Sequence, residues 1–291
     1  MLHVTGRRDD GYHELETVFQ LVDLCDRLHF ETLSESLISL EVAPGATPLA
    51  WPASDDLAVR AAQLLRTQAL SQGQTPGGVR ITIEKRIPVG GGLGGGSSDA
   101  ATTLLALNRL WRLDWSLERL AQLGLALGAD VPVFVRGNNA YARGVGEQLT
   151  PIALPKRHFV IVQPPVGVPT ASVFREPNLT RDTKPLTLAG FAQAQASDAQ
   201  RLPGHNDLEP VVVLRFGAVA KALSALQDAA TRCGVDRSAV RMSGSGGCVF
   251  AATHSLSVAE ELASMVEIAG VGRVHRCAAL DQHPMVGAVV S

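Results

Sequence analysis

The fold is decided by the stretch Pro88-Val-Gly-Gly-Gly-Leu-Gly-Gly-Gly-Ser-Ser-Asp-Ala100, in which six of the seven residues from 90 to 96 are glycine. The apolar residues 79–83 precede it and predict a strand, and residues 97–107 follow it and predict the start of a helix. Glycine lacks Cβ, so the N–H groups of such a loop can approach a ligand closely. Because the N-terminus of a helix also favours negative charge, the stretch predicts an anion site, with phosphate as the first ligand to consider. A flexible linker is the alternative, but linkers are seldom so short and so closely bracketed by apolar residues.

Three common glycine motifs do not fit this stretch. A Walker loop needs a lysine directly after its last glycine, and none follows here. The glycines satisfy Gly-x-Gly-x-x-Gly, but Asp114, the acidic residue at the expected spacing, lies in a turn between two predicted helices rather than after a strand. A hydrolase elbow needs glycine two residues before and two residues after the serine, and neither Ser97, Ser98 nor Ser245 has both. A loop that wraps polyphosphate with its backbone remains.

Polar residues near the loop are candidates for phosphate chemistry. The hydroxyls of Ser97 and Ser98 can hydrogen-bond phosphate or hold a magnesium ion between phosphates, and Ser97 can equally be a plain N-cap. Asp130, in Gly128-Ala-Asp-Val-Pro132, suits a general base or charge partner for a substrate hydroxyl. The alternative for Asp130 is a turn aspartate that bonds its own backbone, with Pro132 fixing the turn.

Two further segments have both a functional and a structural interpretation. Gly11-Tyr12-His13, with Phe19 nearby, offers aromatic surfaces and an imidazole that can bond the edge of a base, although such residues in a strand usually only pack. The second glycine loop, Ser243-Gly-Ser-Gly-Gly247, lies between two predicted strands and can be a backbone-donor loop or a simple tight turn.

Composition narrows the class of protein. The chain has 291 residues and a formal net charge of −2, which argues against a nucleic-acid or anionic-membrane partner. No apolar run reaches the ~18 residues of a membrane helix, and the N-terminus does not resemble a secretory signal. The four cysteines are widely scattered and predict reduced thiols in a cytoplasmic protein. The histidines lack metal-ligand spacing, so no protein-ligated metal is assigned with certainty.

The remaining patterns predict an α+β protein. Residues 14–22, 26–32 and 36–42 alternate apolar and polar positions and together predict an antiparallel meander. Asp55 and Asp56 predict the cap of a helix that runs to about residue 71. Further helices are expected at 97–111, 116–127, 172–175, 187–199, 215–233 and 257–269, and further strands at 1–4, 79–85, 139–143, 146–151, 158–162, 239–242, 248–253 and 273–278.

Three segments together resemble a known family. Residues 88–98, Gly128-Ala-Asp-Val-Pro132 and Met242-Ser-Gly-Ser-Gly-Gly247 are similar to the signature loops of the GHMP kinases, which include galactokinase and the homoserine, mevalonate and phosphomevalonate kinases. Gly6-Arg-Arg-Asp-Asp-Gly-Tyr-His-Glu-Leu15 and His205-Asn-Asp-Leu-Glu209 look closer to one branch of that family. The substrate of that branch is an alcohol linked to cytidine diphosphate, in non-mevalonate isoprenoid biosynthesis. The likeness runs in order along nearly the whole chain.

The resemblance implies a fold and a domain division. It implies a GHMP kinase N-terminal domain over residues 1–152, similar to domain 2 of ribosomal protein S5. It also implies a ferredoxin-like C-terminal domain over residues 153–291, with the site between the two domains. A monomer or weak homodimer that takes only small molecules, ATP and the CDP-linked alcohol, is the expected state.

The resemblance also implies residue roles, with ATP and Mg²⁺ as cofactors. It makes Asp130 the catalytic base and places the helix start at Asp56 near the adenine. The ATP phosphates would be cradled by Pro88, Val89, Gly90, Gly91, Gly92, Leu93, Gly94, Gly95, Gly96, Ser97 and Ser98. Substrate would be bound by Tyr12, Phe19 and Phe174, which flank the cytosine, by His13, which bonds it, and by Gly246.

One family feature is not found in the chain. Members normally open with a strand of the type Pro-Ala-Lys-x-Asn-Leu, whose lysine pairs with the catalytic aspartate, but here Met1 directly precedes Leu2. A start placed at an internal methionine would explain this, and the chain as written is expected to transfer phosphate poorly. The alternatives are another GHMP kinase, of the homoserine or mevalonate type, and a catalytically impaired nucleotide-binding protein.

Overall fold

The chain folds into two compact units, each built from separate segments. The structure is a computed structural model and describes residues 1–198 and 201–289. The first unit comprises Met1–Leu24, Pro88–Leu93 and Asn139–Asp281, and the second comprises Cys25–Ile87, Gly94–Asn138 and the residues from Gln282 onward. The glycine stretch therefore passes from the first unit to the second between Leu93 and Gly94.

The second unit is built on a three-stranded sheet in the order β4-β6-β5. The strands are β4 (Arg27–Leu33), β5 (Ile38–Val42) and β6 (Gly78–Glu84). The expected antiparallel meander is wrong, because β6 lies between β4 and β5, antiparallel to the first and parallel to the second. Alternating apolar residues determine which face of a strand is buried, but they do not determine which strand pairs with it.

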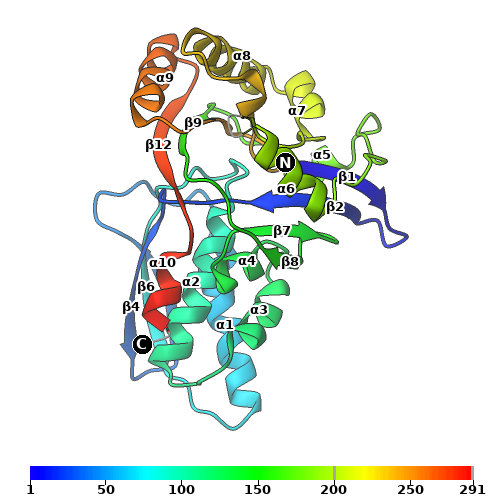
Figure 1. Ribbon diagram of the computed structural model, residues 1–291. Helices are drawn as coiled ribbons and strands as arrows, with labels where there is room; N and C mark the ends of the chain where they lie inside the picture. Colours follow the sequence, from blue (N-terminus) through cyan, green and yellow to red (C-terminus); the bar gives the residue numbers. More distant parts are fainter. Residues whose placement is uncertain (199–200, 290–291) are drawn as a thin grey trace. The chain divides into compact units, whose positions relative to one another are not determined.

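Two helices pack on this sheet around a largely aliphatic core, and three more pack against those two helices or each other. They are α1 (Leu57–Ser71), α2 (Gly95–Leu110), α3 (Leu117–Leu125), α4 (Val131–Arg136) and α10 (Pro284–Val289). The helices α1 and α2 run side by side, and Leu65, Leu104 and Leu105 are fully buried there with Ile81 of β6 (Figure 1). α1, α2 and α3 agree with the expected helices within about two residues. The sequence did not predict α4, since a turn fixed by Pro132 was the expected local structure around Asp130, nor did it predict α10.

The first unit contains two antiparallel sheets. One has the order β1-β2-β7-β8, and the other has the order β10-β11-β9-β12-β3. The strands of the first sheet are β1 (Leu2–Arg7), β2 (His13–Phe19), β7 (Ala140–Arg143) and β8 (Gln148–Pro151). Those of the second are β3 (Leu21–Val22), β9 (His158–Gln163), β10 (Val240–Met242), β11 (Val249–Thr253) and β12 (Arg273–Leu280). All but β3, which continues the expected strand at 14–22, correspond one to one to expected strands.

The two longest helices of this unit pack against the five-stranded sheet. α8 (Gly217–Arg232) contacts β11, and α9 (Leu256–Ala269) contacts β12 and β9. The helix expected over 215–233 corresponds to α8, whereas α7 (Glu209–Arg215), which Phe216 at φ −119° and ψ 87° separates from α8, was not expected. Two further helices are α5 (Thr170–Phe174) and α6 (Leu188–Ser197), and residue 199, the expected end of α6, lies outside the described residues.

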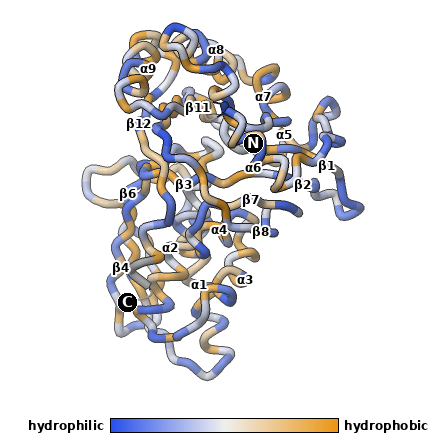
Figure 2. Tube along the Cα trace, viewed as in Figure 1, coloured by the Kyte–Doolittle hydropathy of each residue, from blue (hydrophilic) through white to orange (hydrophobic). Residues whose placement is uncertain are grey.

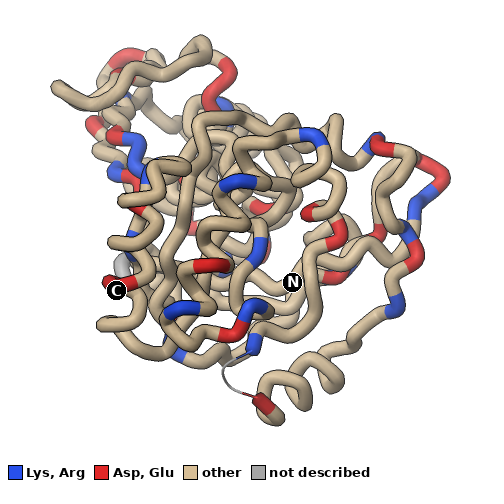
Figure 3. Tube along the Cα trace, turned by 90° about the horizontal axis from the view of Figure 1, so that it is seen from above, with Lys and Arg blue, Asp and Glu red and all other residues tan. Residues whose placement is uncertain are grey.

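The distribution of polar and charged residues can be followed along the chain. Figure 2 shows hydrophilic residues at the turn between β1 and β2. Basic and acidic residues are interspersed along the trace rather than gathered into long runs of one sign (Figure 3). Among the described residues, no helix has the length and apolar character needed to cross a bilayer.

Candidate active site

The two glycine loops that the sequence singles out separately lie against each other in the first unit. The carbonyl of Gly92 accepts a hydrogen bond from Ser243 Oγ at 2.8 Å, and Cys248 N–H donates to the carbonyl of Gly91 at 3.0 Å. Gly92 has φ +71°, and a Cβ placed on it would lie 2.2 Å from the carbonyl oxygen of Ser243. Only glycine fits here, because both the backbone conformation and the contact exclude a side chain.

The segment that contains Asn206 holds the second glycine loop in place. Asn206 Nδ2 donates to the carbonyls of Met242 at 3.0 Å and Gly244 at 2.9 Å. Glu209 accepts from Met242 N–H at 2.6 Å. Gly246, at φ +110°, closes the loop by donating its N–H to Ser243 at 3.0 Å. The structure thus explains a sequence motif to which residue patterns alone assign no role.

In the second unit the glycine stretch ends as the first turn of α2. Gly94 is the N-cap, in a left-handed conformation and without a side-chain cap bond, and Ser98 N–H makes the first intrahelical bond, to Gly94 at 2.8 Å. The N–H groups of residues 95–97 precede that bond and lack helical partners. Ser97 is a helical residue and not the N-cap, which corrects one alternative for it. Three backbone donors at the start of a 16-residue helix fit an anion.

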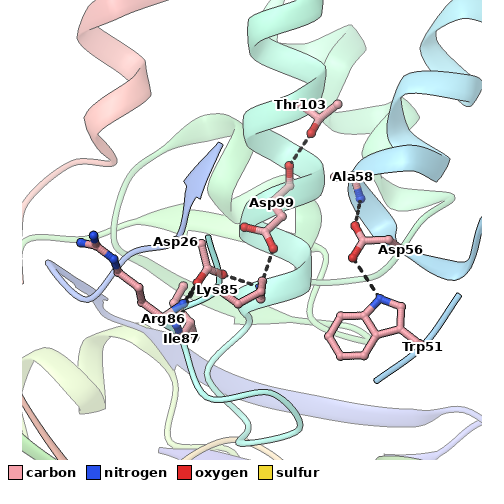
Figure 4. Close-up of polar contacts among 9 residues, drawn as sticks. All are labelled: Asp26, Trp51, Asp56, Ala58, Lys85, Arg86, Ile87, Asp99 and Thr103. Atoms are coloured by element: carbon pink, nitrogen blue, oxygen red, sulfur yellow. Dashed lines mark hydrogen bonds and ion pairs between the residues drawn. The ribbon is translucent and has the colours of Figure 1, made fainter. Parts of the chain in front are cut away.

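A buried lysine lies beside this first turn. Lys85 Nζ bonds a carboxylate oxygen of Asp26 and also Asp99 Oδ2, the latter at 2.5 Å (Figure 4). The other oxygen of Asp26 accepts from the backbone N–H groups of Arg86 at 2.5 Å and Ile87 at 2.8 Å. These bonds fix the chain between the end of β6 and the glycine stretch, so we call Lys85, Asp26 and Asp99 the loop clamp.

The loop clamp holds two carboxylates for one ammonium group. Burial would by itself lower the pKa of Lys85, but Asp99 and Asp26 outweigh burial and raise it. Burial raises the pKa of Asp99 from 3.8 to about 7, and the neighbouring charge of Asp26 adds to that rise while Lys85 opposes it. Burial and the second carboxylate therefore make Asp99 easier to protonate than an exposed aspartate.

Asp130 lies at the N-terminus of α4 and not in a turn that bonds its own side chain. It is the N-cap residue, but its carboxylate makes no cap hydrogen bond. Among the hydrogen bonds and ion pairs found for the described part of the chain, none involves this carboxylate. Burial raises its pKa, so the group holds a proton more tightly than an exposed aspartate does.

Asp56 has a structural role that its sequence position predicts. Its Oδ1 accepts from Ala58 N–H at 2.9 Å, the N-cap bond of α1, and its Oδ2 accepts from Trp51 Nε1 at 3.0 Å (Figure 4). The side chain is buried, and both of its oxygens have protein partners.

Only some of the residues expected to bind the substrate lie close together in the first unit. The ring of His13 lies 5.1 Å from that of Phe174, tilted by 31°. Tyr12, directly before His13, is 64% exposed. Phe19 lies at the far end of the same strand, β2, from His13. The structure thus brings His13 and Phe174 together, with Tyr12 beside them in the chain.

Sequence reasoning missed the loop clamp and Arg181. The clamp residues are 14 and 59 positions apart along the chain. The one available signal was that Lys85 and Asp99 are charged residues that flank the glycine stretch on both sides. Arg181 donates from Nε to His13 Nε2 at 3.0 Å, across 168 positions, and no local pattern marks it.

Comparison with known proteins identifies the class. The family model of the GHMP kinases N terminal domain matches residues 56–138, and that of the GHMP kinases C terminal domain matches residues 189–272. The first range holds the whole glycine stretch and Asp130, and the second range holds the second glycine loop, so these segments lie within the two GHMP kinase domains.

Relatives narrow the class further. The chain is 50% identical over 262 residues to the 4-diphosphocytidyl-2-C-methyl-D-erythritol kinase of Nitrosomonas europaea, covering 90% of this chain and 87% of the relative. It is 49% identical to the enzyme of that name from Paraburkholderia phytofirmans, covering 98% and 92%. The crystal structure of a 4-(cytidine 5'-diphospho)-2C-methyl-D-erythritol kinase matches with a TM-score of 0.77 at 36% identity, over 96% of this chain and 94% of that one. The chain therefore belongs to the 4-diphosphocytidyl-2-C-methyl-D-erythritol kinase family.

Proposed function

We propose that the chain transfers the γ-phosphate of ATP to the 2-hydroxyl of 4-diphosphocytidyl-2-C-methyl-D-erythritol, a step in non-mevalonate isoprenoid biosynthesis. Its family supports the reaction, and one structural observation carries it: the glycine stretch ends in three N–H groups at the start of α2 that lack helical partners. Backbone donors of this kind suit the phosphates of a nucleotide.

Residues 88–98 form the proposed phosphate cradle. The N–H groups of Gly95, Gly96 and Ser97 are donors for phosphate oxygens, and the loop clamp fixes the chain that enters the cradle. We also place Asp56 near the adenine, where it acts by capping α1. Backbone donors set in advance stabilise the charge of the transferring group without rearrangement.

Mg²⁺ is the proposed metal. Among the described residues there is no group of three or more His, Cys, Asp or Glu side chains that could hold an ion by itself. The neighbouring residues fit an ion shared with nucleotide phosphates, because Ser97 and Ser98 supply hydroxyl oxygens. When bound, Mg²⁺ would neutralise negative charge on the nucleotide phosphates during transfer.

Asp130 is the proposed general base. Its carboxylate is not used in a cap bond, and burial raises its pKa, as suits a group that accepts a proton. It takes the proton of the 2-hydroxyl as that oxygen forms its bond to the γ-phosphorus. The bond from the γ-phosphorus to the bridging oxygen breaks, and ADP leaves.

The cytidine end of the substrate is assigned to the first unit. Tyr12, Phe19 and Phe174 are the proposed aromatic contacts of the cytosine, His13 its hydrogen-bond partner, and Gly246 a backbone contact. The stacked pair of His13 and Phe174 supports this assignment. Proteins commonly recognise an unpaired base by stacking aromatic side chains on it and by hydrogen bonds to its edge.

Some finer features rest on the family resemblance alone. We propose a domain boundary near residue 152, an N-terminal domain like domain 2 of ribosomal protein S5, and a ferredoxin-like C-terminal domain. A cytoplasmic location and a monomer or weak homodimer complete the proposal.

A substrate panel tests the function. The purified chain is given ATP and, in turn, the CDP-linked methylerythritol, homoserine and mevalonate, and ADP release is measured. ADP release that depends on the CDP-linked alcohol, exceeding that with the other two at least a hundredfold, is expected. Preference for homoserine or mevalonate would contradict the assignment, and so would ATP binding without turnover of any of the three.

A further inference from the structure

Arg181 makes an unusual number of hydrogen bonds for a single side chain of the first unit. A guanidinium group has five N–H donors and no acceptor. Its Nε donates to His13 Nε2 at 3.0 Å. Its two Nη atoms donate to the carbonyls of Phe174 at 3.0 Å, Glu176 at 2.7 Å, Pro177 at 3.4 Å and Leu179 at 3.0 Å.

These bonds determine the protonation of His13. An Arg Nε–H can only donate, so His13 Nε2 must present its lone pair and carries no proton. The imidazolium form would have N–H groups on both nitrogens and is excluded by the same bond. His13 is therefore neutral, and its proton lies on Nδ1.

The surrounding charges act in the same direction. Burial, then Arg181, then Arg7 on the paired position of β1 lower the pKa of His13. The ring of Phe174 covers it at 5.1 Å and carries no charge. Among the described residues that shift the pKa of His13 there is no carboxylate, so none of them favours a second proton.

We propose that Arg181 is a positioning residue that holds His13 as the neutral Nδ1–H tautomer and so makes it a hydrogen-bond donor toward a bound base. The consequence for substrate choice rests on the proposed function. The same side chain bonds the carbonyl of Phe174, so it orders both members of the stacked pair.

A fixed donor selects among pyrimidines. The N3 atom of cytosine is an acceptor, whereas N3 of uracil carries a proton and is a donor. A donor at His13 Nδ1 matches the first and opposes the second. A histidine free to change tautomer would accept either base, so Arg181 would set the preference for the cytidine-linked substrate over its uridine analogue.

Nitrogen NMR of the full chain without ligand tests the tautomer directly. The protein is labelled with ¹⁵N-histidine, and the His13 signals are assigned by their loss in His13→Gln. The wild type is expected to show a protonated Nδ1 and an unprotonated Nε2 from pH 6 to pH 8. A protonated Nε2 would overturn the proposal, whether or not any variant folds.

Variants separate positioning from a general structural role. Arg181→Met is expected to shift His13 toward the Nε2–H tautomer and to raise its pKa, and Arg181→Lys, which retains a donor, is expected to preserve Nδ1–H. Arg175→Met is the matched control, because Arg175 is an exposed arginine of the same segment whose Nε donates to the carbonyl of Ala171 and not to His13. An unchanged tautomer in Arg181→Met would contradict the proposal.

Kinetics then test the link to substrate. Arg181→Met is expected to raise KM for the CDP-linked alcohol about tenfold, as for the loss of one hydrogen bond, with kcat changed by less than about twofold. Its preference over the uridine analogue should fall by a similar factor. If the wild type turns over neither substrate, the proposed function fails while the tautomer result stands. An Nδ1–H tautomer with unchanged KM and preference in the variant would refute the specificity role alone.

Discussion

Asp130 shows how one side chain can be free for chemistry in a tightly built unit. It occupies the N-cap position of α4, yet it makes no cap bond. An N-cap aspartate normally accepts from a backbone N–H of the first turn, and that bond stabilises a helix by about 1 kcal/mol. Because the carboxylate of Asp130 does not make this stabilising bond, it remains available to interact with a substrate.

Replacing Asp130 tests the general base. Asp130→Asn should lower kcat by about 10² to 10⁴, the usual contribution of a positioned base, while the affinity for a non-hydrolysable ATP analogue stays within a few-fold. Burial raises the pKa of Asp130 above the ordinary aspartate value of 3.8. The kcat of the wild type should therefore fall on acidification already at a pH above that value. Steady-state kinetics between pH 5 and 8, with the exposed Asp228→Asn as control, measure both effects. Near-normal turnover in Asp130→Asn would refute the base role.

The loop clamp predicts a pH dependence of stability. The pKa of Asp99 is about 7 in the folded chain and 3.8 ordinarily, so the folded state binds this proton more tightly. The stability that it contributes is present below about pH 4 and is lost as the pH rises through 7. Asp99→Asn should remove this loss, because an amide stays neutral and its oxygen can still accept from Lys85.

Urea unfolding at several pH values measures this effect. Relative to the wild type, Asp99→Asn should gain free energy of unfolding between pH 4 and 8. The gain has an upper bound of about 4 kcal/mol, because one pKa unit corresponds to about 1.36 kcal/mol. Asp55→Asn, an exposed neighbour in the same unit, should show no such gain. A difference between Asp99→Asn and the wild type that is independent of pH would contradict the account.

At the scale of elements, glycine is required in this stretch for two different reasons, close contact and backbone conformation. The composition of the stretch does not show which reason applies to which residue. Gly91 and Gly92 are needed because the second glycine loop is in contact with them, and their neighbours are backbone atoms or a buried thiol. Gly90 has a similar φ of +65°, but a Cβ there would meet nothing within 4 Å. Gly90 therefore needs glycine for its conformation alone.

This contrast gives a matched pair of variants. Gly90→Ala should lower the free energy of unfolding by about 1 kcal/mol, the usual cost of alanine at positive φ. Gly92→Ala should cost more than about 3 kcal/mol, because its Cβ would also lie 2.2 Å from the carbonyl of Ser243. Urea unfolding compares the two. Equal losses would show that the two loops are not in contact as described.

The sequence predicts elements well where the signal is local. The cap at Asp56 predicts the start of α1, and the expected ranges of α1 and α3 agree with the structure within about two residues. The helix α7 was missed because it has only seven residues and three of them are valines, which are weak helix formers. The order of β4, β6 and β5 was also missed, because pairing depends on contacts between residues far apart in the chain.

At the scale of the whole molecule, the motifs predicted the family, while the contacts among them were not predictable. The glycine stretch, Asp130 and the second glycine loop are each visible as local patterns, and the two family models confirm their class. The loop clamp and the bond from Arg181 to His13 join residues that no periodicity relates. Long-range polar contacts of this kind can be identified only once the fold is known.

At the scale of the whole molecule, the proposed function also predicts which oxygen of the product carries the transferred phosphate. The name of the substrate places a methyl group on C2, so the carbon that bears the 2-hydroxyl has no hydrogen. A phosphate on that oxygen has no three-bond coupling to a proton on the carbon that bears it. Phosphate on the 1-hydroxyl or the 3-hydroxyl would be split by the hydrogens of its own carbon.

Proton-coupled ³¹P NMR of the reaction mixture is the most direct measurement. The purified chain, ATP, Mg²⁺ and the CDP-linked methylerythritol are expected to give one new, unsplit phosphomonoester resonance, one ADP per product and an intact cytidine diphosphate linkage. A split phosphomonoester resonance, or ADP formed with free phosphate alone, would contradict transfer to the 2-hydroxyl.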